Sequence, residues 1–167
     1  SWILQNISIY LAIALVVIFQ PEIRRALAEL GKHPFFGFSA EVHTAIEQVV
    51  EAVTALAREK NGALIAFERN IGTRAIQETG TMLGAKITTE LLSSIFFPRN
   101  LLHDGGVIIN GDKIMAAGCV FPLSEQTELS KTLGTRHRAA LGLSEETDAA
   151  VIVVSEETGS ISSCYRG

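Results

Sequence analysis

Two arginines flank a histidine in the segment "GTRHRAALG" (residues 134–142), although the chain has a formal net charge of −4. Apolar residues follow this triplet at helical spacing, which predicts a helix from about Arg136 to Leu143. Thr135 suits the N-cap of that helix, and Gly134 lets backbone approach a ligand closely. Free N–H groups at a helix start, with guanidinium groups beside them, suit a phosphate. The alternative is a solvated helix face.

A histidine, an aspartate and two glycines precede an apolar run in "LLHDGGVIIN" (residues 101–110). The carboxylate of Asp104 is a suitable ligand for Mg²⁺ or Mn²⁺, and the glycines after it allow a ligand to meet backbone. A metal that bridges carboxylates and phosphate oxygens is the usual arrangement for phosphoryl and nucleotidyl transfer. The alternative is an Asp-Gly turn that only introduces a strand.

A third polar segment, "VVSEETG" (residues 153–159), follows an apolar run. Ser155, Glu156 and Glu157 leave the end of a predicted strand, where α/β sheets gather ligand-binding groups. The alternative is a hairpin turn without a binding role.

The elements that must position these groups are read from hydrophobic periodicity. A helix capped by Ser39 is expected to run to about residue 58, with Val42, Ile46, Val49, Val50, Val53 and Leu56 on one face. Further helices are predicted at 73–84 and 89–97, and strands at 63–67, 106–110, 113–121, 149–155 and 160–166. Helices alternate with strands, which favours parallel pairing, but two hairpins are also present. The fold class is therefore α/β with a mixed central β-sheet flanked by helices.

The first 20 residues are uncharged and mostly apolar, although Gln5, Asn6 and Ser8 interrupt the apolar run, and at about 1.5 Å per residue they roughly span a bilayer core. We therefore expect a transmembrane helix at 1–20, an amphipathic helix and linker at 21–38, and a single catalytic domain at 39–167. Arg24, Arg25 and Lys32 follow the apolar run and would keep that domain on the cytoplasmic side of the membrane. The alternative is a buried core helix.

The charge balance argues against a nucleic-acid partner. From residue 35 onward the chain has 11 Lys and Arg against 16 Asp and Glu, whereas nucleic-acid binding favours an excess of positive charge. A P-loop is also excluded, because Gly31-Lys32 is followed by His33 instead of Ser or Thr.

The pairing of "HDG" with "GTRHR" about thirty residues later resembles the diadenylate cyclase (DAC, DisA_N) domain family, the bacterial synthases of cyclic di-AMP. The resemblance covers essentially the whole chain, and "VVIFQPEIRRALAELG" is similar to the membrane-anchored CdaA type of this family. That type generally has three transmembrane helices, so the resemblance implies further helices before residue 1.

The resemblance implies that each subunit of a face-to-face homodimer binds one ATP, and that each 3′-hydroxyl attacks the α-phosphate of the other ATP. Asp104, Arg136, His137 and Arg138 would be catalytic, and His103, Asp104 and Glu157 would hold Mg²⁺ or Mn²⁺. The implied substrate-binding residues are Gly105, Gly106, Val120, Phe121, Gly134, Thr135, Arg136, Arg138, Ser155 and Glu156. The hydrophobic residues after Cys119 would line the adenine pocket.

Two residues depart from the family pattern. Relatives usually have alanine where this chain has Gly106, which is expected to loosen the site, and often an aromatic residue at the position of Val120. The alternative function is therefore a degenerate domain that senses ATP or cyclic di-AMP without catalysis. A third possibility is a membrane-tethered scaffold. The sequence does not identify a regulatory protein partner.

Overall fold

The computed structural model describes residues 19–20, 40–126 and 134–167. The chain divides into two units, residues 1–38 and 39–167. Apart from Phe19 and Gln20, the predicted transmembrane and amphipathic helices lie outside the described residues, and so does the predicted Ser39 cap. Within the described ranges, every helix is too short or too polar to cross a bilayer.

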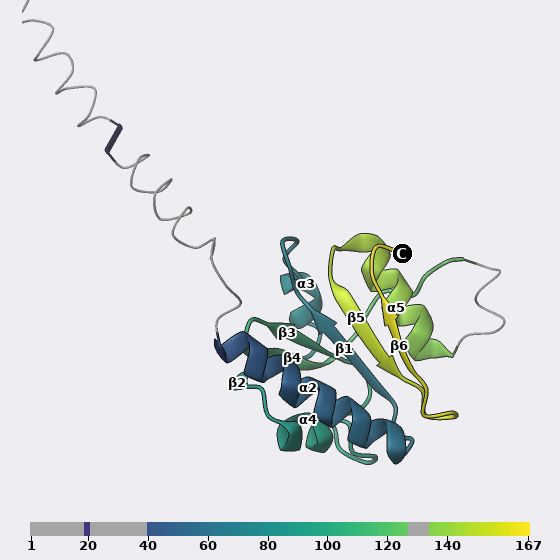
Figure 1. The fold of residues 1–167 in the computed structure, drawn as a ribbon. Helices are drawn as coiled ribbons and strands as arrows, with labels where there is room; N and C mark the ends of the chain where they lie inside the picture. The colour runs from purple at the N-terminus through teal and green to yellow at the C-terminus, as the bar shows by residue number, and fades with distance from the viewer. Residues whose placement is uncertain (1–18, 21–39, 127–133) are drawn as a thin grey trace, which may run out of the picture. The chain divides into compact units, whose positions relative to one another are not determined.

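The second unit contains four helices and six strands among its described residues (Figure 1). In chain order they are α2 (Ala40–Arg58), β1 (Ala63–Phe67), α3 (Arg74–Gln77), β2 (Thr81–Lys86), α4 (Thr89–Ile95), β3 (Gly106–Asn110), β4 (Lys113–Cys119), α5 (Thr135–Glu146), β5 (Ala150–Val154) and β6 (Ile161–Cys164).

The strands form one sheet in the order β2-β4-β3-β1-β5-β6. The central strands β1 and β3 are parallel, and every other neighbouring pair is antiparallel. The predicted mixed sheet and both predicted hairpins, β3-β4 and β5-β6, are therefore confirmed. Because β1 and β3 start at the same end of the sheet, the segments before them meet there, together with the ends of β4 and β5.

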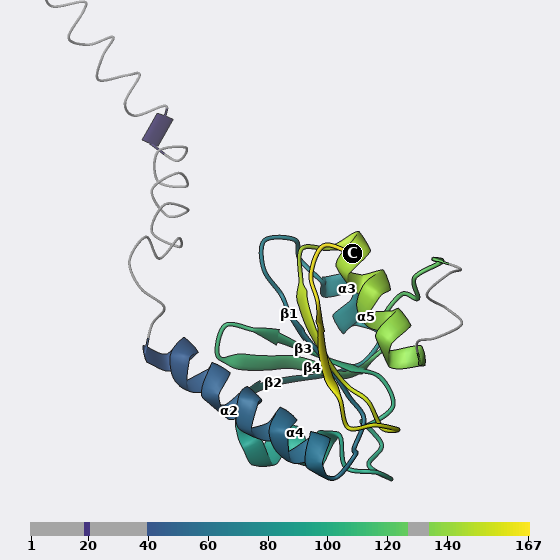
Figure 2. The same cartoon turned by 45° about the vertical axis from the view of Figure 1, so that its right-hand side comes forward.

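Helices cover both faces of the sheet (Figures 1 and 2). On one face, α2 and α4 lie side by side over a core that includes Val49, Leu56 and Phe96. On the other face, α5 packs over a second core that includes Leu64, Ile108 and Leu143. The two cores hold the sheet rigidly between helices, so that loops at its ends are fixed in position.

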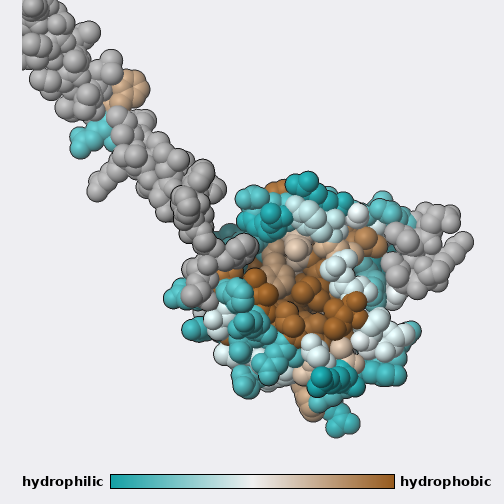
Figure 3. Space-filling model, viewed as in Figure 1, coloured by the Kyte–Doolittle hydropathy of each residue, from teal (hydrophilic) through white to brown (hydrophobic). Residues whose placement is uncertain are grey.

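The apolar face of α2 is wider than its buried stripe. Val49, Val53 and Leu56 are buried as predicted, but Ile46 and Val50 are exposed. A hydrophobic area is visible on this side of the domain, between α2 and strands β5 and β6 (Figure 3).

The helix predicted at 73–84 is wrong for most of its length. Only α3 is helical there, and the following residues form the edge strand β2, which pairs with β4. Gly84 lies within β2 and has φ +61°, a conformation that is not helical. It accompanies a break in the β2-β4 register between Met82 and Ala85. Pairing with β4 therefore outweighed the helical spacing of this segment.

Candidate functional site

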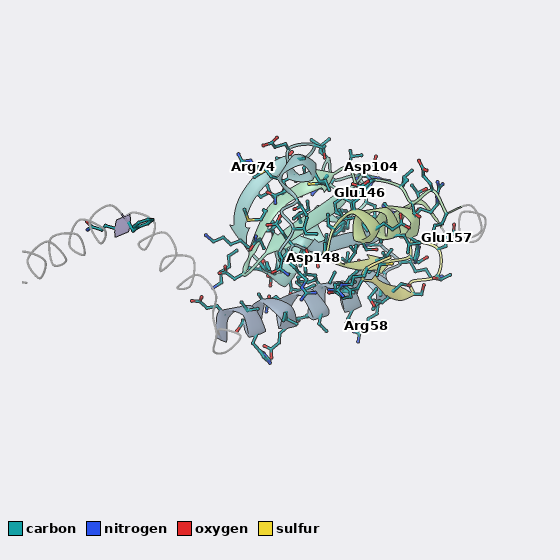
Figure 4. The ribbon with its side chains drawn as sticks, turned by 90° about the horizontal axis from the view of Figure 1, so that it is seen from above. Arg58, Arg74, Asp104, Glu146, Asp148 and Glu157 are labelled. Carbon is teal, nitrogen blue, oxygen red and sulfur yellow. The ribbon has the colours of Figure 1, made fainter. Side chains whose placement is uncertain are left out.

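The predicted site residues gather at the end of the sheet where β1 and β3 begin, β4 and β5 end, and α5 begins. The strand order places the "HDGG" segment before β3 and the "SEET" segment after β5 at this same end. In Figure 4, Asp104 and Glu157 lie toward this end, whereas Arg74 lies toward the other. The fold thus brings together three segments that are far apart in the sequence.

The first cleft at this end, here called the Asp104 cleft, has a volume of about 640 Å³. Its lining residues are Leu64, His103, Asp104, Gly105, Cys119, Val120, Phe121, Leu123, Thr135, Arg136, Ala139 and Glu156. The lining includes both apolar side chains and charged groups. Burial raises the pKa of the Cys119 thiol to about 11, so this cysteine is a neutral part of the apolar wall at neutral pH.

The second cleft, here called the Arg136 cleft, has a volume of about 350 Å³ and is lined mainly by polar groups. Its lining residues are Gly134, Thr135, Arg136, His137, Val154, Ser155, Glu156, Glu157, Thr158, Ser160 and Ser162. Thr135, Arg136 and Glu156 line both clefts, which therefore adjoin at these residues. Ser155 to Ser160 also form the turn of the β5-β6 hairpin, so the turn and the binding interpretation of this segment are compatible.

A close ion pair lies where the two clefts adjoin. The Arg136 Nη1 donates to Glu156 Oε2, and both groups lie against the backbone of Gly62. A Cβ at Gly62 would come within 2.5 Å of Arg136 Nη1 and 3.1 Å of Glu156 Oε2. Sequence reasoning missed Gly62, because the Asn61-Gly62 step was interpreted only as the end of the preceding helix. Its position directly before β1 was the available signal.

The start of α5 differs from the prediction in a way that favours an anion. The helix begins at Thr135 instead of Arg136, and its N-cap is Gly134, whose lack of a side chain leaves the helix without a side-chain cap. Thr135 is thus not the N-cap but the first helical residue, and it faces both clefts. Because no described side chain caps this helix start, its N–H groups are suited to bind a phosphate beside Arg136 and His137.

The structure does not bring Arg138 into either cleft. Its side chain is half-buried on α5, and its Nε is fully buried without a hydrogen-bond partner among the described residues. Its backbone carbonyl accepts a hydrogen bond from Ser124 N at 3.0 Å. Arg138, which the resemblance assigns to phosphate binding, thus does not line the clefts that contain the other predicted phosphate ligands.

The predicted metal ligands are divided between the clefts. His103 and Asp104 line the Asp104 cleft and Glu157 lines the Arg136 cleft, and no cluster of three potential ligands forms within the described ranges. The His103 Nδ1 lies against the backbone oxygen of Asn100, an arrangement that leaves its Nε2 as an acceptor, as in many metal-binding histidines. Asp104 is exposed and has no hydrogen bond or ion pair with the described residues.

The loop after β4 is fixed onto α5. The Glu145 carboxylate accepts hydrogen bonds from Ser124 Oγ at 2.8 Å and from Gln126 Nε2 at 2.7 Å. A Cβ at Gly142 would come within 2.2 Å of the Pro122 oxygen, so loop and helix are in direct backbone contact. These contacts, which sequence reasoning did not identify, hold the apolar wall of the Asp104 cleft at a set distance from the start of α5.

Curated proteins similar to the chain carry cyclase names. It is 46% identical over 172 aligned residues to "Cyclic di-AMP synthase CdaA" of Bacillus subtilis, an alignment that covers 100% of the chain and 63% of that protein. It is 47% identical over 167 residues to "Diadenylate cyclase" of Listeria monocytogenes, covering 97% of the chain and 61% of that protein. The chain thus spans less than two thirds of the length of these relatives.

Solved structures agree with the fold. A double mutant of DacA from Staphylococcus aureus superimposes with a TM-score of 0.73 at 47% identity, covering 75% of the chain and 83% of that structure. A hypothetical membrane spanning protein from Bacillus cereus gives a TM-score of 0.72 at 38% identity, covering 91% and 76%. Residues 50–167 match the family described as "DisA bacterial checkpoint controller nucleotide-binding". Together with the fold and the two adjoining clefts, this match shows that the chain belongs to that family, the diadenylate cyclase family.

Proposed function

We propose that the protein is a diadenylate cyclase, which condenses two ATP molecules into cyclic di-AMP and releases two pyrophosphates. The observation that carries this proposal is the meeting of the two clefts at Arg136. One cleft has apolar side chains and a carboxylate without a partner among the described residues, and the other has a helix start that no described side chain caps, together with hydroxyl groups. A nucleotide with a base, a ribose and a triphosphate requires these environments in this order. The names of the relatives support the same activity.

The lining of the clefts supports a specific placement of ATP. The adenine would lie against the apolar wall formed by Phe121, Val120 and Leu123, with Gly105 near the ribose. Gly106, which was expected beside it, does not line the cleft, because the Phe121 ring covers it. The triphosphate would extend past Arg136 to the N–H groups at the start of α5. Thr135, His137 and Ser155 line that path, and they would donate hydrogen bonds to phosphate oxygens.

In the reaction, the 3′-hydroxyl oxygen of one ATP forms a bond to the α-phosphorus of the other. The bond from this phosphorus to the oxygen that bridges it to the β-phosphate breaks, and pyrophosphate leaves with the bonding electrons. The hydroxyl proton passes to solvent, because an ordinary carboxylate is a weak base for a sugar hydroxyl. Asp104 would orient the hydroxyl by accepting its hydrogen bond, and Arg136 would stabilise the negative charge that spreads over the phosphate oxygens.

A divalent cation, Mg²⁺ or Mn²⁺, would be held by His103 Nε2 and Asp104, with phosphate oxygens completing its coordination. Bound there, it would neutralise phosphate charge and lower the pKa of the attacking hydroxyl. The free Asp104 carboxylate and the orientation of His103 fit this role. Glu157 lies in the other cleft, where it would face the outer phosphates and any cation bound to them.

Two subunits are required, because each subunit offers one such site and the reaction joins two ATP molecules. A face-to-face homodimer would place each 3′-hydroxyl in line with the other α-phosphate. A membrane anchor at residues 1–20 would raise the effective concentration of subunits and keep residues 39–167 in the cytoplasm of a bacterial cell.

The first experiment is incubation of the protein with ATP and Mn²⁺, followed by chromatography of the nucleotides. We expect cyclic di-AMP and pyrophosphate in a 1:2 ratio, no product without divalent cation, and no cyclic di-GMP from GTP. Equal turnover of GTP would contradict the proposal. Tight ATP binding without any product would instead identify a nucleotide sensor.

The second experiment measures rate against protein concentration, with molar mass from light scattering in the same samples. Specific activity should rise with concentration and reach a plateau as the dimer forms. A monomer with constant specific activity over a wide dilution series would exclude the two-subunit mechanism.

A further inference from the structure

The ring of Phe121 lies directly on the backbone of Gly106. A Cβ at Gly106 would come within 2.3 Å of the ring atom Cζ, 2.6 Å of Cε1 and 2.7 Å of Cε2. Real Cβ atoms do not approach other carbons this closely, so the ring occupies the space that any side chain at position 106 would need. This contact runs across the β3-β4 hairpin, in which Gly106 pairs with Cys119.

The surroundings of Phe121 leave its ring one direction in which to move. Phe121 belongs to the core beneath α5, together with fully buried residues such as Ile108, Ala140 and Leu143. The ring nevertheless lines the Asp104 cleft, and its exposed fraction is 5%. Because the core is filled, a group added at Gly106 would push the ring away from the backbone and into the cleft.

The ring is a buried part of the cleft wall, and its neighbours supply most of the exposed apolar surface there. Val120 is 68% exposed and Leu123 is 46% exposed, whereas Phe121 is 5% exposed. A ring that is displaced into the cleft would take space from any group bound beside Val120 and Leu123. The position of the Phe121 ring therefore decides how much room a base has.

We propose that Gly106 and Phe121 form a matched pair that sets the shape of the apolar wall of the Asp104 cleft. The absence of a side chain at Gly106 admits the ring, and the ring, held back from the cleft, leaves room for the base. The glycine does not loosen the site, as the sequence suggested, because the ring fills the space. This inference rests on the proposed function only for the identity of the base as the adenine of ATP.

The test is a double-mutant cycle in the complete 167-residue chain: Gly106→Ala, Phe121→Leu and the two combined. Leucine lacks counterparts of the three ring atoms that would collide with a Cβ at position 106. Each variant is examined by thermal unfolding without nucleotide and by calorimetric binding of the α,β-methylene analogue of ATP, which cannot release pyrophosphate.

Gly106→Ala alone should lower Tm by roughly 3 to 10 °C and weaken binding of the analogue about 10-fold or more. Phe121→Leu should weaken binding because part of the cleft wall is lost. In the double variant the added methyl should cost almost nothing, so that its Tm equals that of Phe121→Leu. Gly72→Ala is the matched glycine control, because a Cβ there has open space and no effect is expected.

Phe96→Leu is the matched aromatic control, since Phe96 is buried in the other core, on the α2 side of the sheet. Its effect on Tm should add to that of Gly106→Ala, whereas the effect of Phe121→Leu should not. Additive effects of Gly106→Ala and Phe121→Leu on Tm would overturn the matched pair. If the Tm changes were not additive but both single variants bound the analogue as tightly as wild type, the role of the pair in shaping the cleft would be overturned. If the wild-type chain bound no analogue, the proposed function would fail, while the Tm cycle would still decide the pairing.

Discussion

The two ends of the central sheet carry similar polar groups but use them differently. At the end away from the clefts, the Glu68 carboxylate accepts hydrogen bonds from the Thr73 backbone and hydroxyl, Gln77 Nε2 and Asn110 Nδ2. Asp148, at the same end, accepts hydrogen bonds from two backbone N–H groups and one side chain. These carboxylates are saturated by the protein itself.

At the cleft end, the corresponding groups are left incomplete. Asp104 is exposed and has no hydrogen bond or ion pair with the described residues, and no described side chain caps the start of α5. Polar groups that are left to solvent in this way remain available to a ligand. The difference indicates that one end stabilises the fold and the other binds substrate, and each prediction below tests this division.

The largest effect is expected from Asp104→Asn. Because the carboxylate contacts nothing in the described protein, its loss should leave Tm almost unchanged, while cyclic di-AMP formation should fall by about 100-fold or more. Asp112→Asn, in the β3-β4 turn, is the control and should keep both properties. The measurements are product chromatography and thermal unfolding. A large fall in Tm with Asp104→Asn would mean that this carboxylate stabilises the fold.

Arg136→Ala should act on ATP affinity. Removal of a charge-assisted hydrogen bond to phosphate costs about 1.5 to 3 kcal/mol, which corresponds to an apparent ATP requirement raised by roughly 10 to 150-fold. Arg74→Ala is the control, because Arg74 is exposed, lines neither cleft and, among the described residues, pairs only with Glu78 one helical turn away. Steady-state kinetics would show the difference. If Arg136→Ala had the kinetics of wild type, the "TRHR" segment would be interpreted as a solvated helix face.

At the opposite end, Glu68→Gln should lower the free energy of unfolding by about 1 to 3 kcal/mol, since an amide cannot accept all the hydrogen bonds that the carboxylate accepts. ATP affinity should not change. Glu78→Gln, which removes only an exposed ion pair, should change stability by less than about 1 kcal/mol. Urea unfolding gives both values. A rise in the ATP requirement of Glu68→Gln would show that the two ends are not independent.

The smallest expected effect is the pH dependence at the same end. Burial raises the pKa of Glu68, but the hydrogen bonds from Thr73, Asn110 and Gln77 together outweigh it and hold the pKa below its usual value of 4.5. A carboxyl group with a lowered pKa in the folded state stabilises the protein above pH 4.5, and this contribution is lost as pH falls through the folded pKa. The stability difference between wild type and Glu68→Gln, measured by urea unfolding, should therefore shrink below pH 4.5. A difference independent of pH would assign the effect to packing.

Much of the fold follows from local patterns. The helix at 40–58 and the hairpins of 106–119 and 150–164 were predictable, because periodicity and turn residues agree with the tertiary structure in these segments. The segment 73–84 was not, because its apolar residues fit a helix and only pairing with β4 makes it a strand. The exposure of Ile46 and Val50 could not be predicted either, because it depends on how far α2 extends over the sheet.

The site was predictable in its residue types but not in its internal contacts. The three polar segments were identified from charge and glycine content, and the fold brings them together at one end of the sheet. The Arg136-Glu156 pair over Gly62 and the ring of Phe121 over Gly106 depend on distances across the sheet, which no local pattern encodes. The placement of Arg138 outside both clefts is a further consequence of helix orientation.

The register break in β2 has a consequence for solubility. Strand β2 forms one edge of the sheet, and a regular edge strand exposes a row of N–H and C=O groups that can pair with another chain and start aggregation. The bulge between Met82 and Ala85 interrupts this row, and Lys86 adds a charge at its end. Molecules crowded together at high local concentration are thus hindered from joining edge to edge through β2, and growth into fibrils from that edge is suppressed.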